Sequence, residues 1–242
     1  MDNLSRLPRH VSLIMDGNGR WALQRGKERV DGHIEGVNSV REVMKTSLEL
    51  GIEYISFFAF SEENWGRPQE EVNCLMELML KALDNELKTF TDNGVRLLVL
   101  GNRERLPESL KESIDRVCSL TSDGPKMTMI LFLSYSGKWD ILQAAKKMAQ
   151  ELIKDPGRSF SEEDFGELLT TARIPDPDLI IRTSGEERLS NYLLVAVVGV
   201  TLDGDAADLE LPGVVVIYLK AALLTVGKSG HKSKRQNGQK TS

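Results

Sequence analysis

Two hydrophobic periodicities alternate along the chain. Short uninterrupted apolar runs are typical of buried strands, whereas apolar residues three or four positions apart form one face of a helix. The runs predict strands over residues 11–15, 54–60, 95–100, 127–133 and 178–181. Helical spacing predicts a helix that begins at Trp21 and further helices over 37–50, 70–90, 107–120, 140–154 and 161–171.

This alternation predicts an α/β fold with a mostly parallel central sheet covered by helices. No internal repeat or low-complexity linker interrupts the pattern before Asn191. Ligands of such sheets bind beyond the carboxyl ends of the strands. We therefore expect three polar segments to converge at one edge of the sheet, namely 16–20, 61–67 and 182–190.

The segment 8–21, P-R-H-V-S-L-I-M-D-G-N-G-R-W, joins an apolar strand to an acid and a glycine-rich turn. Gly17 and Gly19 allow the backbone to approach an anion closely, and Asp16 suits a divalent cation that bridges a carboxylate and phosphates. The local chemistry indicates a diphosphate with Mg²⁺. An ordinary strand–turn–helix corner, with Asp16 or Asn18 as helix cap, also explains the segment, and the glycine spacing alone favours it.

Composition narrows the class of protein. The 242 residues carry a net charge of −5, which argues against a nucleic-acid binder driven by general phosphate attraction. Cys74 and Cys118 have no metal-like spacing, so neither a disulfide scaffold nor a zinc site is expected. The first ten residues lack the apolar core of a signal peptide, and no apolar run is long enough to span a membrane. We expect a soluble, cytoplasmic protein.

Four motifs occur in order: M-D-G-N-G-R-W (15–21), R-V-D-G-H (29–33), F-S-E-E-N-W-G-R-P (60–68) and D-L-I-I-R-T-S-G-E-E-R-L-S-N-Y-L-L (178–194). Together they resemble the cis-prenyltransferase family. The resemblance implies a homodimeric α/β fold with a long apolar tunnel. It also implies an Mg²⁺-dependent transferase that condenses isopentenyl diphosphate onto an allylic diphosphate, typically farnesyl diphosphate. The product would be a polyprenyl diphosphate with cis double bonds, such as undecaprenyl diphosphate, through which the enzyme contacts membranes peripherally.

The resemblance assigns a role to each motif residue. Asp16 would hold Mg²⁺, and Asn64 and His33 would assist at the reacting ends and in proton removal. The allylic diphosphate would be bound by Gly17, Asn18, Gly19, Arg20 and Arg29, and isopentenyl diphosphate by Arg182, Arg188 and Ser190. Ser61 and Arg67 would support the loop of Asn64, with Trp21 and Trp65 in packing or at the flank of the substrate.

Two of these roles have simpler structural alternatives. A lone histidine is more often a hydrogen-bonded structural residue than a base. Only the family spacing of His33 from Asp16 favours the role of a base. The apolar stripe on the helix over 70–90 is core by default, although the resemblance makes it a tunnel wall. Its members are Met76, Met79, Leu80 and Leu83.

The resemblance stops after Leu194. The family continues with W-Q-x-A-Y-x-E and W-P-D-F, neither of which is found in this chain. Their loss implies a missing second acid at the Mg²⁺ site, a missing closing strand and a weakened dimer contact. We predict a catalytic domain over 1–194 and a frameshifted or replaced tail over 195–242, whose basic, polar end over 227–242 is disordered.

Two other functions remain open. A noncatalytic family subunit that stabilises a partner is favoured by the altered tail but disfavoured by the intact Asp16 and Asn64. An unrelated phosphatase or nucleotide binder on a similar sheet is disfavoured by four ordered motifs.

Overall fold

The computed structural model describes residues 7–185, 188–195 and 215–219. Its centre is a six-stranded sheet in the order β3-β4-β2-β1-β5-β6, and every neighbouring pair is parallel. The strands are β1 (His10–Ile14), β2 (Tyr54–Ser61), β3 (Val95–Leu100), β4 (Met127–Tyr135), β5 (Leu179–Thr183) and β6 (Val215–Leu219). The predicted parallel α/β fold is confirmed.

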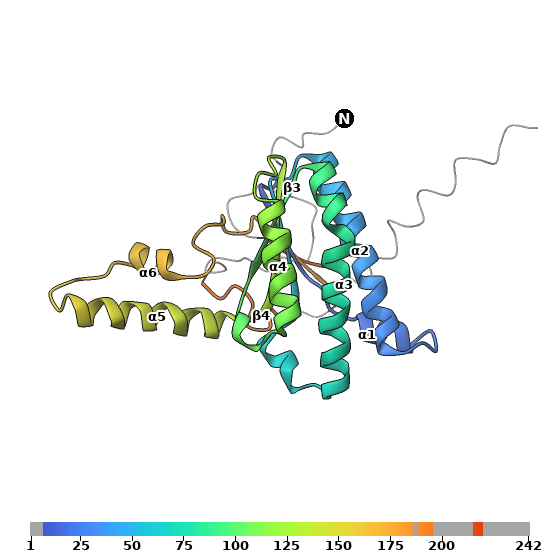
Figure 1. The fold of residues 1–242 in the computed structure, drawn as a ribbon, viewed down its shortest axis with the longest axis horizontal. Helices are drawn as coiled ribbons and strands as arrows, with labels where there is room; N and C mark the ends of the chain where they lie inside the picture. The colour runs from blue at the N-terminus through green and yellow to red at the C-terminus, as the bar shows by residue number, and fades with distance from the viewer. Residues whose placement is uncertain (1–6, 186–187, 196–214, 220–242) are drawn as a thin grey trace, which may run out of the picture.

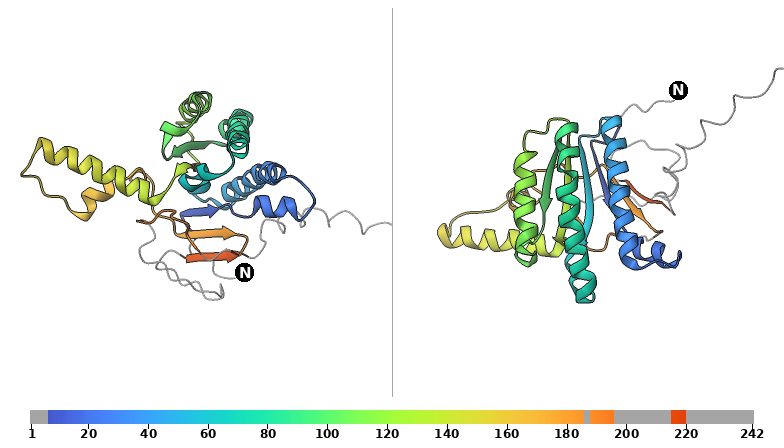
Figure 2. Two further views of the ribbon diagram at one scale, coloured as in Figure 1. Left: turned by 90° about the horizontal axis from the view of Figure 1, so that it is seen from below. Right: turned by 45° about the vertical axis from the view of Figure 1, so that its right-hand side comes forward.

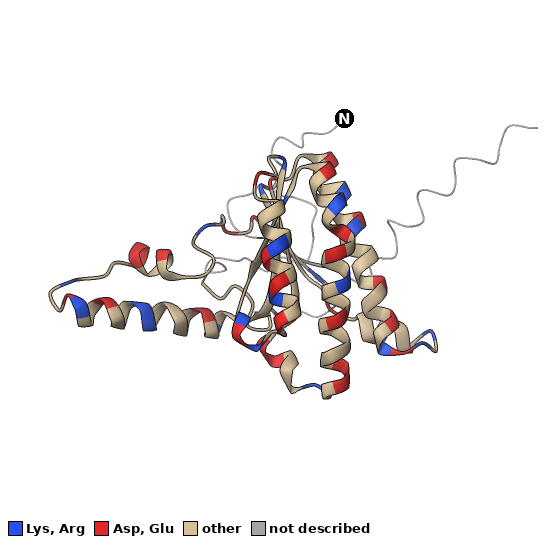
Figure 3. Ribbon diagram, in the orientation of Figure 1, with Lys and Arg blue, Asp and Glu red and all other residues tan. Residues whose placement is uncertain are grey.

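Some helices cover one face of the sheet, and others project away from it. The α-helices are α1 (Asn18–Leu23), α2 (Arg29–Leu50), α3 (Gln69–Asn93), α4 (Glu108–Leu120), α5 (Gly137–Lys154) and α6 (Glu162–Leu168), and the 3₁₀ turns are η1 (Glu62–Gly66) and η2 (Arg103–Arg105). Helices α2, α3 and α4 lie side by side over the sheet, whereas α5 and α6 project away from it (Figures 1 and 2). Both charge signs are mixed along α3 and α5 (Figure 3).

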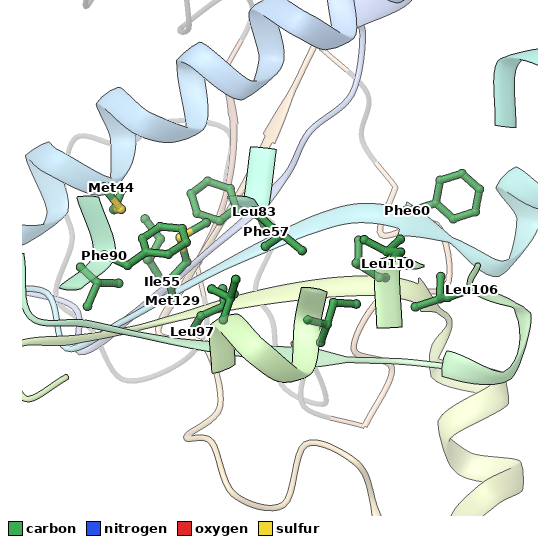
Figure 4. Packing of buried hydrophobic residues seen from close by; sticks show 14 of the residues in the cluster. Met44, Ile55, Phe57, Phe60, Leu83, Phe90, Leu97, Leu106, Leu110 and Met129 are labelled. Carbon is green, nitrogen blue, oxygen red and sulfur yellow. The ribbon is translucent and has the colours of Figure 1, made fainter. Parts of the chain in front are cut away.

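The two sheet faces carry separate apolar clusters, because side chains alternate along each strand. Leu13 and Phe57 belong to the larger cluster, which also contains residues of α2, α3 and α4. Figure 4 shows Phe57 among them. Ile14 and Phe58, their chain neighbours, belong to the second cluster on the opposite face. Tyr192 and Leu193, from the segment after β5, help cover this second cluster. That segment therefore contributes to the core as well as to the polar edge.

Several predicted boundaries shift. Helix α6 ends at Leu168 rather than at 171, and the turn after it is held by the backbone hydrogen bond from Leu169 to Gly166. Strand β5 continues to Thr183, so Arg182 lies inside the strand instead of after it. The apolar pattern could not show this, because the strand continues through a charged residue that is only 4% exposed.

The predicted tail over 195–242 lies outside the described residues apart from Val195 and β6. The expectation that the sheet lacks a closing strand is wrong, because Val215–Leu219 pairs in parallel with β5. The boundary at 194 and the disorder of 227–242 stay predictions. Within the described ranges, no helix is both long and apolar enough to cross a membrane.

Candidate active site

Asp16 and Arg182 form the centre of a polar cluster at the carboxyl ends of β1 and β5. Arg182 Nη2 donates to Asp16 Oδ2 at 2.9 Å, and Arg20 Nη2 lies 3.3 Å from the other carboxylate oxygen. Burial alone would raise the pKa of Asp16, but the hydrogen bond and charge of Arg182, with the charge of Arg20, hold it below its usual value. Asp16 is therefore a carboxylate held between two cations.

Arg182 also organises the segment that follows β5. Its Nη1 donates to Ser190 Oγ at 2.8 Å and to the carbonyl oxygen of Arg188. Ser190, Asn191 and Leu193 all have positive φ angles, of 50°, 61° and 45°, which side-chain-bearing residues rarely adopt and which cluster at ligand sites. The chain is thereby folded back so that Arg188 and Ser190, both exposed, stand beside the Asp16 cluster.

Tyr192 anchors this strained segment from the other face of the sheet. Its ring stacks on Phe58 with centroids 4.4 Å apart, and its hydroxyl lies 2.8 Å from Ser12 Oγ. Ser12 accepts a hydrogen bond from Ser56, which in turn lies 2.9 Å from His10 Nε2. Burial lowers the pKa of His10, so this chain of hydrogen bonds is uncharged near neutral pH.

Glycine is needed at position 17 for a steric reason. Gly17 has a φ of 92°, and a Cβ added there would lie 1.6 Å from Ser184 Oγ. Ser184 Oγ donates to the carbonyl oxygen of Asp16 at 2.8 Å, so β1 and β5 are tied together at this point. Gly17 itself occupies the N-cap of α1, and neither Asp16 nor Asn18 caps the helix through its side chain. The helix-cap alternative is therefore wrong.

A second cluster centres on Glu71, at the start of α3. Arg67 Nη1 donates to Glu71 Oε1 at 3.0 Å, and Arg29 Nε lies 3.7 Å from the same oxygen. The two clusters adjoin, because a Cβ on Gly19 would lie 3.0 Å from the Arg29 guanidinium. Sequence reasoning missed Glu71, although its four-residue spacing from Arg67 is typical of an ion pair at a helix start.

His33 stands on α2 beside this second cluster. Burial lowers its pKa, the charges of Arg67 and Arg29 lower it further, and Glu71 opposes them. The imidazole is therefore neutral at pH 7, and its Nε2 is buried without a hydrogen-bond partner among the described residues, 4.0 Å from Glu71 Oε1. A neutral imidazole with a free ring nitrogen can accept a proton.

The remaining motif residues of the second polar segment shape the 3₁₀ turn η1. Asn64 Oδ1 accepts from the backbone N–H of Ser61 at 3.1 Å. Trp65 Nε1 donates to Ser134 Oγ at 2.7 Å. These contacts position the turn, and none of the described contacts joins Asn64 to Asp16 or His33.

The three polar segments do converge, as the sequence predicts. Asp16 and Arg182 link the segments after β1 and β5, and Asn191 Nδ2 donates to Glu63 Oε1 at 2.8 Å, which links the segments after β5 and β2. Trp21 does not join this convergence in its described contacts. The Arg25 guanidinium lies 4.5 Å from the Trp21 ring centroid. It contacts neither Asp16 nor Glu71 in the described part of the chain.

An apolar cavity of about 120 Å³ opens beside these clusters, between α2, α3 and the sheet. Asn18 and His33 line its polar end. Two members of the α3 stripe, Met79 and Leu83, line the cavity, and Leu83 also belongs, with Met76, to the buried core. The tunnel-wall interpretation stays a prediction. The remaining apolar lining includes Val37, Val40, Met44, Leu75, Leu78, Ala82 and Phe90.

The donor set at Asp16 fits a divalent cation only in part. Among the described residues no group of three metal-ligating side chains comes together, and Asp16 is the one carboxylate in its cluster, opposite two guanidinium groups. Mg²⁺ is commonly bound by one or two carboxylates with substrate phosphates and water. Asp16 fits that mode when a diphosphate supplies the remaining oxygens.

Comparisons with known proteins show the family to which this chain is similar. The undecaprenyl diphosphate synthase family model matches residues 14–202, eight residues beyond Leu194. An isoprenyl transferase of Chlorobaculum tepidum is 47% identical over 191 residues, 78% of this chain and 72% of that protein. The ditrans,polycis-undecaprenyl-diphosphate synthase ((2E,6E)-farnesyl-diphosphate specific) of Vibrio cholerae is 45% identical over 200 residues, 80% of each chain.

A solved structure is similar as well. Lavandulyl diphosphate synthase from Lavandula x intermedia, in complex with dimethylallyl diphosphate, has a TM-score of 0.75 and 34% sequence identity. The match covers 77% of this chain and 82% of that one. These similarities exclude the unrelated phosphatase or nucleotide binder.

Proposed function

This chain belongs to the undecaprenyl diphosphate synthase family of cis-prenyltransferases, and we propose that it condenses isopentenyl diphosphate onto an allylic diphosphate, with farnesyl diphosphate as primer. The observation that carries this proposal is a positively charged polar edge at the mouth of an apolar cavity. A diphosphate with a prenyl tail needs both surfaces at once.

We propose that two diphosphates bind on either side of Asp16. Arg20 and Arg29, with the backbone of 17–19, suit the allylic diphosphate, because Asn18 of the same turn lines the cavity that would receive its tail and a Cβ on Gly19 would contact Arg29. Arg188 and Ser190 suit isopentenyl diphosphate, since Arg182 holds their segment against the same cluster. Holding the two reactants in line supplies a large part of such a rate enhancement.

In the reaction, the alkene of isopentenyl diphosphate attacks the allylic carbon while the carbon–oxygen bond to pyrophosphate breaks. Loss of a proton then forms the new double bond, and we propose that His33 Nε2 accepts it, because that atom is buried, has no hydrogen-bond partner among the described residues and lies 4.0 Å from the Glu71 carboxylate. Asn64 and Ser61 hold the turn η1 through a reciprocal capping box. Asp16, with the substrate diphosphate, would hold Mg²⁺, which neutralises charge on the departing pyrophosphate.

The test is incorporation of radiolabelled isopentenyl diphosphate by the full chain, with farnesyl diphosphate and Mg²⁺. Asp16→Asn keeps an acceptor for Arg182 but removes the charge, so we expect incorporation to fall at least a hundredfold. The melting temperature should fall as well, because buried Arg182 loses its charged partner, so activities are compared at a temperature at which both proteins are folded. Chelation of Mg²⁺ should have the same effect on incorporation. Asp92→Asn removes an exposed carboxylate that pairs with Lys88 and is the matched control, with parental activity expected.

The altered tail is tested by a second version of the chain. The family's second acid would fall within 195–242, so this version should carry a family-type W-Q-x-A-Y-x-E and W-P-D-F tail after Leu194. Activity and dimer formation in the grafted chain alone would show that the tail is damaged. Equal activity in both would show that the present tail is sufficient, and inactivity in both would support a noncatalytic subunit that needs a partner.

A further inference from the structure

An ion pair interrupts the apolar lining of the cavity. Arg41 and Glu86 both line it, whereas the neighbouring lining residues of α2 and α3 are aliphatic, aromatic or thioether side chains. Arg41 follows His33 by eight residues on α2, which places it about 12 Å farther along the helix axis from the polar end. The charges therefore lie about two helical turns from His33, away from the residues that suit diphosphate.

The pair bridges the two helices that form the cavity walls. Arg41 Nε donates to Glu86 Oε1 at 2.9 Å, and Arg41 Nη2 donates to the same oxygen. The Glu86 side chain is only 12% exposed and that of Arg41 36%, so the carboxylate faces inward while the guanidinium reaches toward solvent. No step of the proposed reaction uses either residue.

From this geometry we propose that the Arg41–Glu86 pair sets the length of hydrocarbon chain that the cavity accepts. The inference deepens the proposed function, since the same limit would then decide how far a polyprenyl product grows. A chain gains about fourfold in affinity for each CH₂ that leaves water for an apolar wall. That gain ends where the next wall atoms are a buried carboxylate and its guanidinium partner, because a hydrocarbon there strips hydration from the charges without replacing it.

A purely structural role for the pair gives different expectations. If Arg41 and Glu86 only hold α2 to α3, removing the pair should loosen the cavity and weaken every ligand alike. If the pair limits chain length, short ligands should bind as before and longer ones should gain. Replacing both residues by apolar ones separates these effects, because apolar replacement of a whole buried pair often leaves stability unchanged, whereas removing one partner is costly.

The first experiment needs no catalysis. The full chain is titrated calorimetrically with saturated n-alkyl diphosphates of increasing length, and affinity should rise with length and then level off. In Arg41→Met/Glu86→Leu the levelling-off should move to longer chains, with short ligands unchanged. Arg41→Met alone should lower the melting temperature by burying an unpaired carboxylate, and the double variant should recover it.

The matched control is Arg116→Met/Asp84→Leu, which removes an ion pair between α3 and α4 with a 2.5 Å contact. Neither residue lines the cavity, so the length at which affinity levels off should stay parental. The same length in the parent and in Arg41→Met/Glu86→Leu would overturn the inference. So would a uniform loss of affinity at all lengths, which would assign the pair a structural role.

The second experiment measures product length. Labelled products of parent and Arg41→Met/Glu86→Leu are separated by reversed-phase chromatography after equal turnover, and the variant should make longer products. Unchanged products from an active variant would refute the link to product length. Absence of product from the parent would instead count against the proposed function, while the alkyl diphosphate series still decides the inference.

Discussion

Replacing Arg182 by methionine should destabilise the protein more than any exposed arginine substitution. The residue is 4% exposed, and its guanidinium donates to Asp16, to Ser190 and to a backbone carbonyl. Removing one partner of a buried ion pair costs about 3–5 kcal/mol. Because the Asp16 side chain is 30% exposed, water can partly replace the lost partner, and we expect the lower end, about 3 kcal/mol.

The loss should depend on pH in a defined direction. Burial acts to raise the pKa of Asp16, but the hydrogen bond and charge of Arg182, the charge of Arg20 and the backbone N–H of Gly17 together outweigh it, so the folded pKa lies below the unfolded value. The carboxylate therefore contributes stability above its unfolded pKa, which is about 4, and that contribution disappears as the pH falls through the lower folded pKa. The stability difference between parent and Arg182→Met should accordingly be largest at about pH 6–7 and shrink below about pH 4.

Thermal unfolding of both proteins from acidic to neutral pH measures this. For a chain of this size, about 3 kcal/mol corresponds to a fall of about 6–12 °C in melting temperature. Arg9→Met is the control, because the Arg9–Glu53 pair is 57% and 58% exposed and exposed ion pairs contribute little to stability. A parental melting temperature for Arg182→Met, or a difference from the parent that persists unchanged into acid, would refute the buried Asp16–Arg182 pair.

Two further predictions concern the backbone around this pair. Gly17→Ala should destabilise the chain in chemical denaturation and reduce activity, since its Cβ would overlap the Ser184 hydroxyl. Gly26→Ala is the control, because Gly26 also has a positive φ but a Cβ there would have nothing within 4 Å, so it should show only the cost of the φ angle, about 1 kcal/mol. Equal losses of stability in the two variants would argue against the steric contact. Tyr192→Phe should cost about 1–2 kcal/mol of stability and raise the KM for isopentenyl diphosphate more than that for the primer; an equal rise in both KM values would show that Tyr192 does not position one subsite.

The sequence predicts most of the fold because apolar periodicity reports directly on which faces are buried. The strand at 95–100 is found where the pattern places it, and the long helix over 70–90 differs only at its ends. Errors arise where polar groups are satisfied by distant partners. Strand β5 continues through Arg182 because Asp16, 166 residues away, pairs with it, and no local pattern contains that information.

The candidate site, like the fold, was predictable from the sequence only in part. Asp16, Arg29, His33, Arg182 and Ser190 are identified from motifs and are brought together. Glu71 was missed, because its role as the common partner of Arg29 and Arg67 depends on where α3 begins relative to α2. Asn64 is predicted to assist the reaction, and the structure adds that its amide caps its own turn.

By itself, then, the sequence determined the parallel α/β architecture and the residue types that meet at its edge. Local apolar periodicity shows which faces are buried, and local motifs show where turns occur. Only the tertiary structure decided which charges pair, that His33 Nε2 is left without a partner among the described residues, and that Arg41 and Glu86 meet inside an apolar cavity. Pairing and desolvation depend on distances of a few ångströms between segments far apart in the chain. These distances exist only after the helices have packed on the sheet.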